Sequence, residues 1–249
     1  MPTATNGSVD LYYETAGSGD PVVFVPDLGC GAWLWAWQVP ALAGPYETIT
    51  WDPRGTGRSS TADTYSIPAL VSDLEAVLAG HGVRTAAVVG AGMGGMVALA
   101  AALESSRVDR LALLGTPAAG ASFDSDAFLG PLDDVSALAS AGFRAAYPEE
   151  VERIVDWREH EDAPADVRAD LAEGVAAFDV SDRLYEITAP ALVVHGQADA
   201  VVSPDAGRDL ADGLPRGRFE GFAEGSHFVF IEQARLVSDS LAGFLDAAH

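Results

Sequence analysis

Residues 85–103, TAAVVGAGMGGMVALAAAL, constrain the fold most, because a short apolar run, a glycine turn and an alanine-rich apolar run follow one another directly. Such a succession predicts a buried strand that turns sharply into a helix. Two motifs compete for the turn. Gly90, Gly92 and Gly95 match the dinucleotide-binding pattern G-x-G-x-x-G. Gly90 and Gly94 also match the nucleophile elbow G-x-S-x-G, with Gly92 in the place of the serine.

The dinucleotide motif requires an acidic residue at the end of the next strand, about 20 residues on, to bind the ribose. The next apolar run, Arg110 to Thr116, ends in Leu-Gly-Thr-Pro and carries no acid. The turn also lies well inside the chain, whereas a dinucleotide-binding unit is usually built around the first strand of its domain. These features disfavour nucleotide binding, and we expect no cofactor.

Length and composition exclude several classes of protein. With 249 residues, 49% of them hydrophobic, the chain can bury one large core. It has no apolar run of membrane-spanning length, and its N-terminus does not resemble a signal peptide, so we expect a cytoplasmic protein. A net charge of -23 disfavours nucleic acid and anionic membranes as partners. The expected partner is a small-molecule substrate, and the oligomeric state stays open.

The reactive side chains narrow the chemistry further. All fourteen basic residues are arginine, which excludes a lysine Schiff base and a P-loop lysine. Cys30 is the only cysteine, so it cannot form an internal disulfide, in keeping with a reducing compartment. The five histidines are scattered without metal-ligand spacing, and we expect no metal.

Apolar runs alternate with helical patterns along most of the chain. Strands are predicted at residues 9–14 (an edge strand), 21–25, 47–51, 85–90, 110–116, 191–195 and 218–222, and helices at 67–78, 205–214 and 232–247. This alternation predicts an α/β fold with a mostly parallel central sheet flanked by helices.

Residues 117–185 interrupt the alternation with a polar segment rich in alanine and acids, which contains several short helical patterns and no convincing strand. We predict a core of residues 1–116 and 186–249, and a helical insertion of residues 117–185 above the carboxyl edge of the sheet.

With this layout, the chain resembles the α/β-hydrolase superfamily over nearly its whole length, with residues 117–185 in the place of the cap. Five local patterns carry the resemblance in the family's order: strand 21–25 followed by Leu28-Gly29, the loop 52–59 (DPRGTGRS), the turn 90–95, the strand end 195–199 (HGQAD) and the loop 225–228 (GSHF). The resemblance implies that Asp199 and His227 are the triad acid and histidine. It also implies that the N–H groups of Leu28 and Met93 form an oxyanion hole.

Two positions depart from the family. Gly92 stands where the serine nucleophile is expected, and Pro26-Asp27 stands where most members have His-Gly. An acyl-enzyme cannot form on glycine, so we expect the space beside Gly92 to admit a water or a substrate oxygen. His227, oriented by Asp199, would then act as general base for direct attack by water or for proton removal.

Asp27 has two competing interpretations. As a turn residue, its side chain would hydrogen-bond a backbone N–H two residues on. As a functional residue, it would be a second acid/base group or a substrate contact, buried under the cap. Cys30 lies in the same loop and is a candidate nucleophile, although a buried apolar role is the simpler explanation. His195 is expected to contribute a hydrogen bond at the edge of the core.

The predicted function is that of a cofactor-free α/β-hydrolase-fold enzyme acting on a small carbonyl compound such as an ester, a lactone or a polyketide-like intermediate. The chemistry is hydrolysis or a lyase-type proton transfer that uses the His227–Asp199 dyad without a serine. Two alternatives stay open: a non-catalytic ligand-binding member of the fold, and a serine hydrolase whose nucleophile has been replaced deliberately.

Overall fold

The sheet in the computed structural model, which describes residues 2–247, has eight strands in the order β1-β2-β4-β3-β5-β6-β7-β8. The β1/β2 and β2/β4 pairs are antiparallel and the other pairs are parallel. The strands are β1 (Thr3–Asn6), β2 (Val9–Gly17), β3 (Asp20–Val25), β4 (Tyr46–Trp51), β5 (Ala86–Ala91), β6 (Val108–Leu114), β7 (Ala191–Gly196) and β8 (Gly217–Phe222). The predicted mostly parallel sheet is therefore confirmed.

The N-terminal edge differs from the prediction. The strand predicted at residues 9–14 extends to Gly17 and is not the edge, because β1 pairs with its outer side and β4 with its inner side. The four residues of β1, TATN, bury Ala4 but carry no apolar run, so no periodic signal marks them as a strand.

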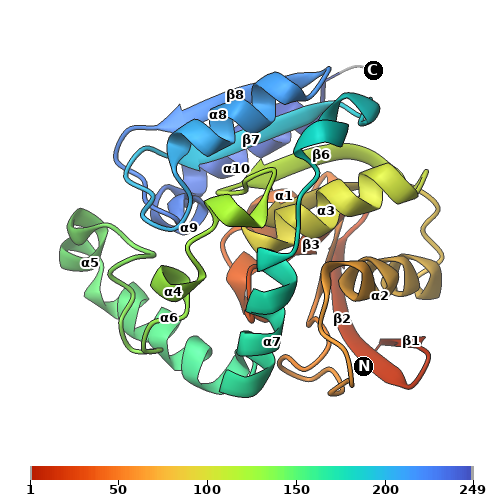
Figure 1. Cartoon of the computed structure of the whole chain (residues 1–249), viewed down its shortest axis with the longest axis horizontal. Coiled ribbons are helices and arrows are strands. Elements are labelled where there is room, and N and C mark those ends of the chain that lie inside the picture. The colour runs from red at the N-terminus through yellow and green to blue at the C-terminus, as the bar shows by residue number, and fades with distance from the viewer. Residues whose placement is uncertain (1, 248–249) are drawn as a thin grey trace.

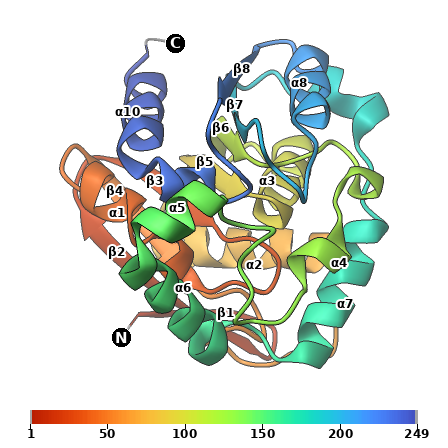
Figure 2. The same cartoon turned by 90° about the vertical axis from the view of Figure 1, so that its left-hand side faces the viewer.

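Helices cover both faces of the sheet (Figure 2). On one face lie α2 (Ile67–Gly80), α3 (Met93–Glu104) and α8 (Pro204–Gly213), and on the other lie α1 (Gln38–Leu42) and α10 (Ala234–Leu245). Two short elements complete the core, η1 (Ala32–Trp35) and α9 (Val229–Glu232). All residues of β5 and of β7 are buried, as expected for parallel strands covered on both faces.

Between β6 and β7 the chain forms η2 (Gly120–Ser122), α4 (Ser125–Phe128), α5 (Ala141–Ala146), α6 (Pro148–Glu161), α7 (Ala165–Ala176) and η3 (Ser181–Glu186). Helices α4 to α7 gather at one end of the molecule (Figure 1). An isolated bridge between Phe123 and Val202 ties this segment to the loop after β7. The division into core and cap stays a prediction. Within residues 2–247, no helix combines the length and the apolar character that crossing a membrane requires.

Candidate active site

The turn between β5 and α3 places Gly92 at the carboxyl end of the central strands. Gly92 has φ 47° and ψ -112°, and its N–H donates to the carbonyl oxygen of Leu114 on β6. The neighbouring glycines permit close packing, since a Cβ at Gly94 would lie 2.1 Å from the carbonyl oxygen of Val25. The glycines thus serve the strand–turn–helix geometry, which needs no nucleotide to explain it.

The space beside Gly92 is filled by the side chain of Asp27. A Cβ built on Gly92 would lie 2.1 Å from Asp27 Oδ1 and 2.2 Å from Oδ2, far inside van der Waals contact. The expectation that this space admits a water or a substrate oxygen is therefore wrong, because a carboxylate of the chain itself occupies it. Asp27 in this position and any side chain at residue 92 exclude one another.

Both oxygens of the Asp27 carboxylate are hydrogen-bonded. Oδ1 accepts from the N–H of Leu28 at 2.7 Å and from the N–H of Met93 at 2.8 Å, and Oδ2 lies 2.9 Å from Nε2 of His227. The two amides expected to form an oxyanion hole thus converge on one carboxylate oxygen. The turn is closed instead by the backbone, where Cys30 N–H donates to Asp27 O, and the side chain points across to α3 and His227.

His227 lies between two carboxylates. Its Nδ1 is 2.9 Å from Oδ2 of Asp199 and its Nε2 is 2.9 Å from Oδ2 of Asp27, and all three side chains are at most 1% exposed. Burial lowers the pKa of His227, but the charge and hydrogen bond of Asp199, then those of Asp27, outweigh it and raise the pKa to about 10. His227 is therefore an imidazolium at neutral pH, and its outward nitrogen is not the free base that was expected.

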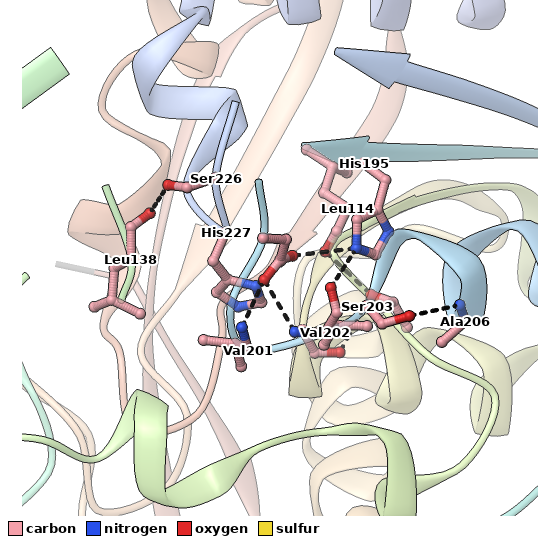
Figure 3. A network of polar contacts seen from close by, with 12 residues as sticks. Leu114, Leu138, His195, Val201, Val202, Ser203, Ala206, Ser226 and His227 are labelled. Atoms are coloured by element: carbon pink, nitrogen blue, oxygen red, sulfur yellow. Dashed lines mark hydrogen bonds and ion pairs between the residues drawn. The ribbon is translucent and has the colours of Figure 1, made fainter. Parts of the chain in front are cut away.

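Asp199 is held by the backbone and contacts two histidines. Its Oδ1 accepts hydrogen bonds from the N–H groups of Val201 and Val202. Its Oδ2 lies 2.9 Å from Nδ1 of His227 and 3.2 Å from Nε2 of His195. Burial raises the pKa of Asp199, but the charge of His227 and the hydrogen bonds of both histidines hold it well below its usual range. His195 and His227 lie on either side of these contacts (Figure 3).

His195 makes the expected core-edge hydrogen bond, since its Nε2 also lies 2.9 Å from the carbonyl oxygen of Val202. Its contact with Asp199 was missed. His195 and Asp199 are four residues apart, and this spacing predicts a contact only when both residues lie on a helix. Here His195 lies on β7 and Asp199 in the loop that follows it.

Aromatic rings close the site from the side of the inserted segment. The rings of Phe123 and Phe128 meet the His227 ring edge-on at centroid distances of 6.0 and 5.6 Å, and Phe228 stacks on it at 6.0 Å. The guanidinium of Arg158 on α6 donates to the carbonyl oxygen of Phe128. Sequence reasoning missed these covering residues, whose only signal was two aromatic residues in a polar segment.

The remaining candidate, Cys30, and the loop 52–59 have structural surroundings. Asp52 accepts from the N–H groups of Ala32 and Arg58, which braces the loop beside the site. The Cys30 thiol is buried, and burial, then the charges of Asp162 and Asp27, raise its pKa well above its ordinary value. Within residues 2–247, no group of three or more His, Cys, Asp or Glu side chains is arranged to hold a metal ion.

Comparison with known proteins agrees with this architecture. Residues 22–240 match the model of the alpha/beta hydrolase family. A protein of Variovorax paradoxus provisionally named carbamate hydrolase RutD is 34% identical, covering 94% of this chain and 96% of its own. The enol-lactonase of Burkholderia xenovorans is 26% identical with a TM-score of 0.90, covering 99% of this chain and all of its own. Est816, an N-acyl homoserine lactone degrading enzyme, is 30% identical with a TM-score of 0.86, covering 98% and 100%.

The fold and the matched residues define an enzyme of the α/β-hydrolase superfamily. The chain belongs to the alpha/beta hydrolase family.

Proposed function

We propose that this chain is a cofactor-independent hydrolase of small esters or lactones that works without a serine nucleophile. The observation that carries the proposal is the Asp27 carboxylate, which is hydrogen-bonded by the Leu28 and Met93 amides and by His227. Asp199 orients His227 in turn. The substrate class is supported by relatives whose names give a carbamate, an enol-lactone and an N-acyl homoserine lactone as their substrates.

Each part has a chemical role in ester hydrolysis. The two amides stabilise the negative charge that develops on a carboxyl oxygen when water attacks. Once His227 has given up the proton that it holds as an imidazolium, it accepts a proton from the attacking water and passes one to the departing alcohol, while Asp199 holds its ring and balances its charge. Gly92 leaves room for Asp27, so the site contains a carboxylate where a serine hydrolase has a hydroxyl.

Steady-state hydrolysis of p-nitrophenyl acetate, γ-butyrolactone, β-butyrolactone and ethyl carbamate tests the proposal. His227→Ala should reduce turnover of the accepted substrate by a factor on the order of a hundred or more, the usual range for a lost acid/base catalyst. His160→Ala is the matched control, since His160 lies on α6 with an exposed side chain. Equal rates for the wild type and His227→Ala would contradict the proposal, and a fluorophosphonate should label neither protein.

A non-catalytic, ligand-binding role is the second candidate, favoured by the burial of Asp27 and His227 at 0% and 1% exposure. That role predicts no turnover of any of the four compounds above the enzyme-free rate. Deliberate replacement of a serine is disfavoured, because Asp27 fills the space that a serine at residue 92 would need.

A further inference from the structure

The side chain of Asp27 occupies the expected oxyanion hole. The hole can therefore bind the carbonyl oxygen of a substrate only after Asp27 has moved, whereas it already binds a carboxyl oxygen of Asp27. The N–H groups of Leu28 and Met93 both donate to Oδ1 of Asp27. A substrate carbonyl oxygen enters the hole only if Asp27 leaves it. Departure would give up two charge-assisted hydrogen bonds and would leave the buried imidazolium of His227 with one carboxylate in place of two. Removing one partner of a buried ion pair in this way is strongly destabilising, because it leaves the other charge uncompensated.

The same contacts leave one reactive position on the carboxylate. An ionised carboxylate offers about four lone-pair sites, roughly two on each oxygen. Oδ1 uses both of its sites on the amides, whereas Oδ2 accepts only from His227. Oδ2 therefore keeps a lone pair, in a buried position where few water molecules compete for it. Carboxylates with such a lone pair act as covalent nucleophiles in several enzyme classes.

Resting on the proposed function, we propose that Asp27 is the nucleophile and that the substrate is a strained lactone, a β-lactone, opened at its saturated carbon. Oδ2 attacks the ring carbon that bears the ring oxygen, the alkyl carbon–oxygen bond breaks, and its electron pair leaves on the carboxylate of the opened substrate. The product of this step is an ester of Asp27 whose carbonyl oxygen, Oδ1, already lies in the oxyanion hole. No group has to leave the hole at any stage.

Ring opening at a saturated carbon fits the surroundings. The leaving group is a carboxylate, which departs without a proton donor. Arg168 of α7 packs against Gly29, two residues after Asp27, since a Cβ there would lie 2.7 Å from Arg168 Cγ. The buried Nε of Arg168 has no hydrogen-bond partner among residues 2–247. The guanidinium of Arg168 places positive charge beside the loop that carries Asp27 and Cys30, and this charge acts against the rise in the pKa of the Cys30 thiol. The rings of Phe123 and Phe128 lie edge-on to His227, whose Nε2 contacts Oδ2, so they give the site an apolar wall on this side.

Hydrolysis of the Asp27 ester completes the cycle. Esterification removes the negative charge that Asp27 places beside His227, so His227 releases its proton to solvent and becomes a base. It then takes a proton from water as the water oxygen attacks Cγ of Asp27, with the oxyanion on Oδ1. The tetrahedral intermediate expels the alkoxide, which His227 protonates. The new carboxylic acid returns its proton to His227, so that lactone and water yield the hydroxy acid anion and one proton.

Oxygen isotopes and stereochemistry test this assignment with (R)-β-butyrolactone as the probe. In water labelled with heavy oxygen and with enzyme in excess, the label should enter the peptide that contains Asp27. In many turnovers it should appear in the hydroxyl group of β-hydroxybutyrate, and the product should have the inverted (S) configuration. His227→Ala, with its acid/base group removed, should accumulate a covalent adduct of one lactone on Asp27, detected by intact mass.

Asp27→Asn keeps the shape of the side chain and removes the nucleophile, so turnover should fall by about a thousand-fold or more. Asp170→Asn, on the exposed surface of α7, is the control and should keep the parent rate. Label in the product carboxylate with retained configuration would overturn the assignment of Asp27 but leave the proposed hydrolase intact. Hydrolysis of the other compounds without hydrolysis of the β-lactone would also overturn the assignment of Asp27 and leave the proposed hydrolase intact. Absence of turnover with all four compounds would overturn both the assignment of Asp27 and the proposed hydrolase activity.

Discussion

Two buried clusters of charge in this molecule are built on opposite principles. Arg54 and Asp73 form a balanced pair, with Nε to Oδ2 at 2.6 Å and Nη2 to Oδ1 at 2.7 Å, and the remaining guanidinium donors bind the carbonyl oxygens of Thr64 and Ala69. At the candidate active site, one imidazolium, His227, is shared by two carboxylates. The balanced cluster has every group satisfied and holds a loop in place. The unbalanced cluster keeps a surplus of negative charge and a free lone pair, which is what a nucleophile needs.

The largest expected effect comes from breaking the balanced cluster. Arg54→Met leaves the Asp73 carboxylate buried, at 0% side-chain exposure, without its cation. The free energy of unfolding should fall by about 4 kcal/mol, the usual cost of leaving one partner of a buried pair uncompensated. Urea denaturation followed by circular dichroism measures it, and the rate per folded molecule should not change.

The double variant Arg54→Met/Asp73→Leu sharpens this result. If the pair is purely structural, replacing both charges by apolar groups should recover most of the lost stability. A double variant as unstable as Arg54→Met would show that the loop needs the ion pair itself, and the contrast with the His227 cluster would then lose its basis.

The next largest effect is expected from variants that introduce a serine nucleophile beside His227. Gly92→Ser alone should gain no esterase activity over the wild type and should not be labelled by a fluorophosphonate, because its Cβ would collide with the carboxylate of Asp27. Asp27→Gly/Gly92→Ser removes the obstacle and empties the oxyanion hole. This double variant should react with the fluorophosphonate, and its esterase activity should exceed that of Gly92→Ser by a factor on the order of a hundred. An equal gain in the single variant would show that Asp27 moves aside freely.

These two departures from the family pattern also mark the limit of what the sequence predicts. The apolar runs and the glycine turn predict the parallel strands, and the resemblance leads to the vicinity of His227, Asp199, Leu28 and Met93. The position of Asp27 depends on how the loop after β3 meets the turn after β5, 66 residues away at Met93. The sequence shows an acid at residue 27 and a glycine at residue 92 as two separate departures from the family pattern. Only the packed structure shows that one side chain fills the space left by the other.

A smaller effect concerns the pH dependence of stability. The pKa of His227 is raised from 6.5 to about 10, so its contribution to stability is complete below pH 6.5 and is lost as the pH rises through 10. Asp27→Asn removes one of the two carboxylates that raise this pKa, so the loss should still begin near pH 6.5 but should end at a lower pH and be smaller in total. Each unit by which the pKa falls corresponds to about 1.4 kcal/mol. Urea midpoints between pH 6 and 10, with Asp170→Asn as the control, measure the difference; superimposable curves for all three proteins would mean that Asp27 does not stabilise the imidazolium.

The smallest effect is expected at Cys30, the group next to the unbalanced cluster that carries no charge. Burial, together with the negative charges of Asp162 and Asp27, keeps its thiol protonated, and a protonated thiol is a poor nucleophile. Iodoacetamide should leave the folded protein unmodified at neutral pH. Cys30→Ala should keep turnover within about twofold and lower the free energy of unfolding by about 1 kcal/mol, as for a typical small change in the core. A large loss of turnover in a folded Cys30→Ala protein would indicate that the Cys30 thiol, and not the Asp27 carboxylate, is the nucleophile. Both groups lie in one loop and are candidates for the same role.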